Sequence, residues 1–98
     1  MSKITQSARN EECQVRLIGI CNHNSETTVF AHYRKGGLGG MGKKPKDIFG
    51  AYACSACHDV LDGRVKAEMD LFTLDSEFKS AVLRTQEILV NKDLIKGI

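Results

Sequence analysis

The stretch 54-CSACHD-59 decides which fold this sequence adopts. Cys54 and Cys57 have the C-x-x-C spacing of a tight turn that can place two thiolates on one metal ion, and His58 follows at once. The same letters, C-x-x-C-H, are also the attachment motif of c-type haem. The two interpretations predict different folds, so the rest of the chain has to distinguish between them.

Two further cysteines favour the metal interpretation. Cys13 and Cys21 are separated by seven residues, and 32 residues lie between Cys21 and Cys54. Four thiolates suit tetrahedral Zn²⁺, and a chain this short often needs a metal to stabilise its core. Haem would leave Cys13 and Cys21 unexplained, whereas two disulfides or four free buried thiols would account for all four cysteines without a metal. We predict a structural Zn²⁺ bound by Cys13, Cys21, Cys54 and Cys57, and no haem.

Length and charge set outer limits on the function. The 98 residues suffice for one small domain, predicted to span 1–98, with a core at about 8–63 and a helical part at about 64–98. No apolar run approaches the roughly 20 residues of a membrane span, and the first residues lack the apolar region of a secretory signal. We therefore expect a cytoplasmic protein, in which disulfides are rare. The formal net charge of +2 falls to 0 once four thiolates and one Zn²⁺ are counted.

The predicted elements follow in the order hairpin, loop, short helix and C-terminal helices. Apolar and polar residues alternate in 13–21, and 27–33 is rich in β-branched and aromatic residues, so these segments are expected to form an antiparallel hairpin. The segment AYACSACHDVLDG, residues 51–63, begins apolar and should continue as a short helix that ends near Gly63. Two helical pieces are expected from Arg64 on, the second with Asp75 as its N-cap and with one apolar face. This face, a scaffold or a homodimer contact, consists of Phe78, Ala81, Val82, Thr85 and Leu89.

A glycine-rich, basic segment occupies residues 34–47 and holds five of the nine glycines. Its GLGGMGKK run nearly matches a P-loop, but Lys44 stands where the metal-binding hydroxyl should be and Pro45 follows, so a nucleotide site is not expected. No acid occurs before Asp47. The segment is therefore predicted either to follow a phosphate backbone or to be a solvated surface loop. Its basic residues are Arg34, Lys35, Lys43, Lys44 and Lys46.

The histidines complete a wider pattern. His32 lies in the second predicted strand, in VFAHYR, and His58 follows the C-x-x-C pair, whereas His23 lies in a turn and is expected at the surface. Two cysteines, a strand histidine, a loop and then C-x-x-C-H on a helix resemble the HNH, or His-Me finger, nucleases with an added zinc site. ECQVRLIGICN, AHYR, KPKDIFGAYACSACHD and RTQ are more closely similar to the YbcO family of small prophage-encoded proteins, over nearly the whole chain. This resemblance implies an α+β fold with a zinc-stabilised ββα-metal (HNH-like) core, and a nuclease assignment that is itself a prediction.

The chain departs from the general HNH pattern at two positions. Many members place an acid or a histidine just before the strand histidine, and here that residue is Ala31. Many also place an asparagine about five residues before the C-x-x-C pair, where this chain has none and Asp47 is the nearest substitute after a shift of register. These departures affect the catalytic metal site more than the fold.

A replacement site can be built from the residues that are present. If 58–62 is helical, His58 and Asp62 face the same way at i, i+4 and suit Mg²⁺, Mn²⁺ or a transition metal, with Asp59 as the second choice of carboxylate. His32 would then activate water against a phosphodiester. The sequence thus predicts a metal-dependent endonuclease that acts on DNA in phage or prophage DNA processing or recombination. The alternative is a non-catalytic zinc module that binds nucleic acid or protein, which has no need of the two histidines.

Overall fold

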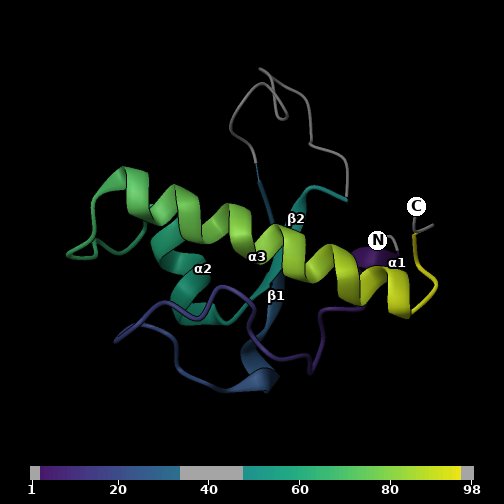
Figure 1. Ribbon diagram of the computed structural model, residues 1–98. Coiled ribbons are helices and arrows are strands. Elements are labelled where there is room, and N and C mark those ends of the chain that lie inside the picture. Colours follow the sequence, from purple (N-terminus) through teal and green to yellow (C-terminus); the bar gives the residue numbers. More distant parts are fainter. Residues whose placement is uncertain (1–2, 34–47, 96–98) are drawn as a thin grey trace.

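The computed structural model describes residues 3–33 and 48–95 of the chain (Figure 1). It is a small α+β fold with a two-stranded antiparallel hairpin and helices. Among the described residues, no helix is long and apolar enough to cross a membrane. The elements are helix α1 (Lys3–Gln6), 3-10 helix η1 (Ser25–Thr27), strand β1 (Val29–His32), strand β2 (Gly50–Ala53), helix α2 (Ser55–Leu61) and helix α3 (Leu71–Asn91).

The hairpin consists of β1 and β2, which lie on either side of the glycine-rich segment. Val29 is opposite Ala53, and His32 is opposite Gly50. The pairing continues one residue past His32, where the amide of Tyr33 donates to the carbonyl of Phe49 at 2.7 Å. The chain therefore leaves β1 and returns to β2 at the end of the hairpin where His32 lies.

The prediction of a strand at 13–21 is wrong. This segment forms no regular strand, and Arg16 (φ 51°) and Gly19 (φ 75°) adopt left-handed conformations that an extended strand does not contain. Its alternation still reflects burial, since Val15 and Leu17 are buried while Arg16 is exposed. The pattern therefore identified Val15 and Leu17 as core residues, but it misidentified the backbone that carries them and placed the buried Gln14 outside the core.

Strand β2 is the centre of the packing. All four of its residues are buried, although the sheet has only two strands. The edge that β1 leaves unpaired is satisfied in two ways: the amide of Tyr52 donates to Thr85 Oγ1 at 3.1 Å, and its carbonyl accepts from the amide of Gln14 at 2.8 Å. One core contains Tyr52, Ala8 and Leu89; the other includes Val15, Leu17, Ala31, Ala51, Ala53, Val60, Phe78, Ala81 and Val82.

The long helix α3 lies across β2 (Figure 1). Its buried residues are those of the predicted apolar face, which is confirmed. The predicted N-cap is wrong, because the helix begins earlier and the carboxylate of Asp70 accepts the amide of Thr73 at 2.6 Å. Asp75 instead accepts a hydrogen bond from the Tyr33 hydroxyl at 2.8 Å. Residues 62–70 form turns, so one helix replaces the two expected pieces.

We expect Thr85→Val to destabilise the protein by about 1–3 kcal/mol, because valine keeps the shape of the side chain but leaves the buried Tyr52 amide without its acceptor. Ser80→Ala, on the exposed face of the same helix, is the matched control and should change the free energy of unfolding by less than about 0.5 kcal/mol. Chemical denaturation of both variants measures the difference. Equal stability of Thr85→Val and wild type would contradict a structural role for this bond.

Candidate metal centre and active site

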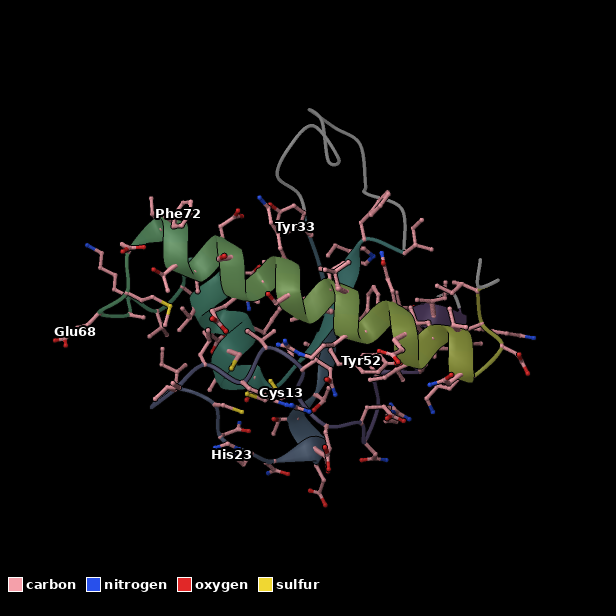
Figure 2. The ribbon with its side chains drawn as sticks, viewed as in Figure 1. Cys13, His23, Tyr33, Tyr52, Glu68 and Phe72 are labelled. Atoms are coloured by element: carbon pink, nitrogen blue, oxygen red, sulfur yellow. The ribbon has the colours of Figure 1, made fainter. Side chains whose placement is uncertain are left out.

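The four cysteines form one cluster, built from two segments that the fold brings together. Cys54 and Cys57 are at the start of α2, while Cys13 and Cys21 flank the irregular segment beside it. Their sulfur atoms all lie within 4.8 Å of one another, and those of Cys21 and Cys54 are 3.8 Å apart. Tetrahedral coordination with Zn–S bonds of about 2.3 Å places neighbouring sulfurs roughly 3.8 Å apart. The cluster, visible as yellow atoms beside Cys13 in Figure 2, could therefore hold a metal ion such as zinc.

Two similar turns position these sulfurs. The Sγ of Cys54 accepts from the amide of Cys57 at 3.4 Å, and the Sγ of Cys13 accepts from the amide of Arg16, also at 3.4 Å. Each turn directs the amide of the residue three positions later at a cysteine sulfur. The first turn has Arg16 where the second has a cysteine, so the fourth ligand has to come from further along the chain, at Cys21.

The protonation states of the cysteine thiols depend on one another. A hydrogen bond with Cys57, supported by the amide of Arg16, lowers the pKa of Cys13 from its ordinary value to about 4, although burial opposes the shift. The same hydrogen bond and burial raise the pKa of Cys57, which keeps its proton. Burial raises the pKa of Cys21 as well. Further thiolates in this volume therefore require a cation, as expected for a metal centre.

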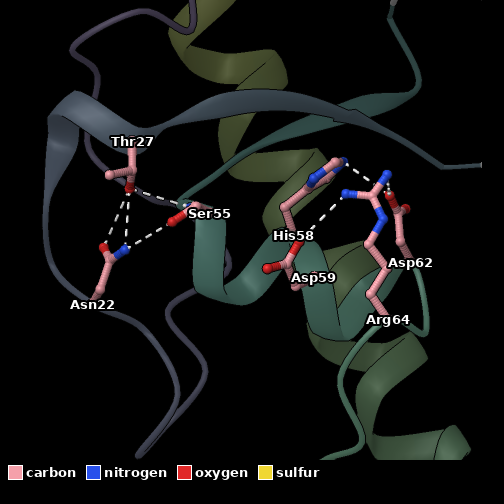
Figure 3. A network of polar contacts seen from close by, with 7 residues as sticks. All are labelled: Asn22, Thr27, Ser55, His58, Asp59, Asp62 and Arg64. Carbon is pink, nitrogen blue, oxygen red and sulfur yellow. Dashed lines mark hydrogen bonds and ion pairs between the residues drawn. The ribbon is translucent and has the colours of Figure 1, made fainter.

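A polar network that sequence analysis missed links Cys21 to the start of α2 (Figure 3). Asn22, the next residue, donates from Nδ2 to Thr27 Oγ1 and to Ser55 Oγ, both at 3.1 Å. The amide of Ser55 in turn donates to Thr27 Oγ1 at 3.2 Å. The network ties the turn before β1 to both pairs of cysteines. Single Asn, Thr and Ser residues in a turn-rich sequence have no spacing that would identify it.

The structure brings together His58, which lies on α2, and Asp62, which caps the C-terminus of this helix (Figure 3). His58 Nε2 lies 3.3 Å from Asp62 Oδ2, and these side chains are 24% and 42% exposed. Arg64, which sequence analysis did not single out, joins them: its guanidinium lies 3.5 Å from Asp62 Oδ2 and 3.4 Å from Asp59 Oδ1. Exposed ion pairs of this kind contribute at most about 1 kcal/mol, so a divalent cation could displace the guanidinium.

His32 is the last residue of β1, and its neighbours define its position. Its ring packs edge-on against Phe30, with ring centroids 5.2 Å apart. Phe30 lies across the backbone of Gly50, where a Cβ atom would be 2.7 Å from Cζ of the ring and closer still to Cε2. Strand β1 also contacts α2, the helix that carries His58. The preceding residue, Ala31, is buried and has no ligand atom to offer.

The remaining predicted site residues lie outside the described part of the chain. They are Arg34, Lys35, Lys43, Lys44 and Lys46, together with Asp47. Within 3–33 and 48–95, the four cysteines are the one set of three or more His, Cys, Asp or Glu side chains close enough to share a metal ion. His58 and Asp62 are thus a two-residue pair that water or substrate would have to complete.

Comparison with known proteins gives one consistent result. The family model described as "Putative nuclease YbcO" matches residues 2–94. Curated proteins of that name from Escherichia coli K12 and from Enterobacteria phage 82 are each 42% identical over 97 residues, covering 99% of this chain and 100% of theirs. A solved structure described as "a putative bacteriophage protein" from Escherichia coli K-12 matches with a TM-score of 0.76 at 39% identity, covering 91% of this chain and 98% of that one.

We expect purified protein to contain close to one zinc ion per chain, and Cys54→Ser to lose it. Loss of the ion should also unfold the protein, because a structural metal contributes its binding free energy to folding. Metal analysis and circular dichroism measure the two effects. Ala56→Ser adds a hydroxyl on the same helix without removing a ligand and should retain zinc. A fully occupied site in Cys54→Ser would contradict the assignment of this ligand.

Proposed function

Because this chain belongs to the YbcO family, we propose that it is a metal-dependent endonuclease that hydrolyses DNA phosphodiester bonds in phage or prophage DNA processing or recombination. The name of two relatives, "Putative nuclease YbcO", supports nuclease function in general terms, and the source of one of them, Enterobacteria phage 82, is consistent with a phage setting. We further propose one domain over 1–98, acting in the cytoplasm, in which zinc holds an HNH-like core of β1, β2 and α2.

The pair of His58 and Asp62 is the observation that carries this proposal. The two side chains lie 3.3 Å apart, on and at the C-terminal end of the helix whose start holds two of the cysteines, and both are partly open to solvent. Mg²⁺ or Mn²⁺ retains several waters in protein sites, so few protein ligands are adequate when substrate oxygens complete the coordination. Asp59 is the second candidate carboxylate. A divalent ion held here would stabilise negative charge on the phosphate and on the leaving oxygen.

His32 is our candidate for the general base. A neutral imidazole can take a proton from the attacking water, and histidine is the most frequent general base in enzymes. Phe30, whose ring lies over the backbone of Gly50, packs edge-on against the His32 ring, and this contact supports the preorganisation that hydrolysis needs. The guanidinium of Arg64 lies within 3.5 Å of both Asp59 and Asp62, and once a divalent ion had displaced it from these carboxylates it would suit a phosphate oxygen.

Two further parts of the proposal concern binding. The basic residues of 34–47 would contact the phosphate backbone without reading bases, and the chain enters and leaves this segment beside His32. A homodimer through the C-terminal helical part would cover apolar side chains that α3 leaves exposed, namely Leu71, Phe72 and Leu83. Neither part is needed for the chemistry.

A non-catalytic zinc module that binds nucleic acid or protein is the alternative function. Ala31 favours it, because many HNH nucleases have a ligand there and a buried alanine leaves the second metal with fewer protein contacts. The same cysteines serve both functions. The two candidate functions differ in their need for His32 and His58: a nuclease requires both for cleavage, whereas a binding module requires neither for binding.

We predict that His32→Ala lowers the rate of DNA cleavage with Mg²⁺ or Mn²⁺ by roughly 10²–10⁴-fold, the usual contribution of a general base. His58→Ala should also lower the rate, and additional divalent ion should recover part of the loss, because this variant weakens metal binding. Zinc content and melting temperature should match wild type in both variants. Single-stranded, duplex and branched DNA are the substrates to compare. A wild-type protein that binds DNA and cleaves none of them with any divalent ion would favour the binding module.

Replacement of Lys43, Lys44 and Lys46 by Gln should weaken DNA binding to a similar extent for all sequences. It should also flatten the salt dependence, because each lost phosphate contact lowers the slope of log K against log salt by about 0.9. Titrations at several salt concentrations measure both effects. Lys79→Gln, on α3, is the control for a lost surface charge. A slope equal to that of wild type would mean that the segment is a solvated loop.

A further inference from the structure

His23 has a strained backbone that its surroundings hold in place. Its φ of 55° lies in the left-handed region, which is unfavourable for a residue with a Cβ atom. Two bonds from backbone amides to side chains stabilise this turn: Asn24 N–H donates to Asn22 Oδ1 at 2.8 Å, and Glu26 N–H donates to Asn24 Oδ1 at 3.1 Å. Strain that a structure maintains in this way often marks a position with a function.

The strained turn places the imidazole at the cysteine cluster. His23 Nδ1 lies 3.8 Å from the Sγ of Cys21, which is the most accessible of the four cysteines, since Cys13, Cys54 and Cys57 are buried. Figure 2 shows His23 on the outer side of the cluster, below Cys13. Cys13, Cys21 and His23 line the same surface cavity, of about 310 Å³, together with Glu12, Arg16 and Ser25. Metal exchange and chelators would reach the cluster from this side.

We propose that His23 is part of the metal centre: Nδ1–H donates a hydrogen bond to the Cys21 thiolate and slows the loss of the bound ion. A metal-bound thiolate carries no proton and can only accept, so the nitrogen must be the donor. Four thiolates leave a zinc site with excess negative charge, and a donor to the most accessible sulfur stabilises that charge. The inference rests on zinc binding by the four cysteines and not on nuclease activity.

Two substitutions separate the hydrogen bond from other roles of the side chain. His23→Gly removes the ring and relieves the backbone strain, so the turn itself should be retained. His23→Phe keeps a ring of similar size over Cys21 but has no donor. Ser25→Ala, which lines the same cavity, is the matched control. All three are made in the full, zinc-loaded chain.

The rate of zinc transfer to a chromophoric chelator at fixed pH is the first measurement. Both His23 variants should release zinc roughly 10-fold faster than wild type, the usual size of such an effect on a metal site, while Ser25→Ala matches wild type. Acceleration in His23→Gly alone would show that the ring only covers the site, and unchanged rates in both would exclude any role. Either result overturns the proposal.

The absorption spectrum of the Co²⁺-substituted protein is the second measurement. Loss of the donor should move the thiolate-to-cobalt charge-transfer band to lower energy in both His23 variants, because Cys21 then becomes a stronger electron donor. The ligand-field bands should remain those of four sulfurs. Wild-type bands typical of three sulfurs and one nitrogen would make His23 a direct ligand and overturn the proposal. If metal analysis finds no zinc in the purified wild-type protein, the assignment of a zinc site to the four cysteines, on which this proposal rests, is refuted.

Discussion

The convergence of four sulfur atoms on one point is the constraint on which the rest of this structure depends. Residues 13–21 contain no helix or strand, and they are held by their cysteines, by the buried side chains of Val15 and Leu17 and by backbone contacts such as that of Gln14 with Tyr52. The same sulfurs fix the first turn of α2, where Cys54 is the N-cap. One metal ion could therefore crosslink the irregular segment to the helix that carries His58. An isolated two-stranded hairpin is marginally stable, so such a crosslink matters here more than in a larger sheet.

The position of β2 explains how so small a sheet forms a core. Its strand is only four residues long, yet β1, α3 and the 13–17 segment surround it, and Thr85 and Gln14 satisfy the backbone groups of Tyr52 that β1 does not reach. Three of its four residues are Gly or Ala, whose small size lets the surrounding elements approach the strand closely. The exception, Tyr52, is fully buried, and its hydroxyl lies 2.7 Å from Ser7 Oγ. The first described residues, through Ser7 and Ala8, thus pack into the same core as Tyr52.

Prediction from the sequence succeeded where the spacing of residues directly reflects metal-ligand geometry or helical periodicity. The cysteine cluster and the buried face of α3 follow from ligand spacing and helical periodicity, and both are present. The strand at 13–21 failed because its alternation reflected the burial of Val15 and Leu17 in a turn. Strand β2 was missed because a strand buried on both faces shows no alternation. His23 and Asn22 were missed because their effect depends on backbone torsion and on partners distant in the chain.

The adjacency of Cys57 and His58 shows how one short motif can serve two sites. Successive residues of a helix point about 100° apart, so Cys57 is directed into the cluster and is fully buried while the His58 side chain remains 24% exposed beside Asp62. A zinc ion with four thiolate ligands has no open position, so it could not itself activate water. Any hydrolytic chemistry must therefore take place beyond the cluster. The C-x-x-C-H spacing is suited to this, because an ion that ordered the first turn of α2 would also fix the direction of the next side chain.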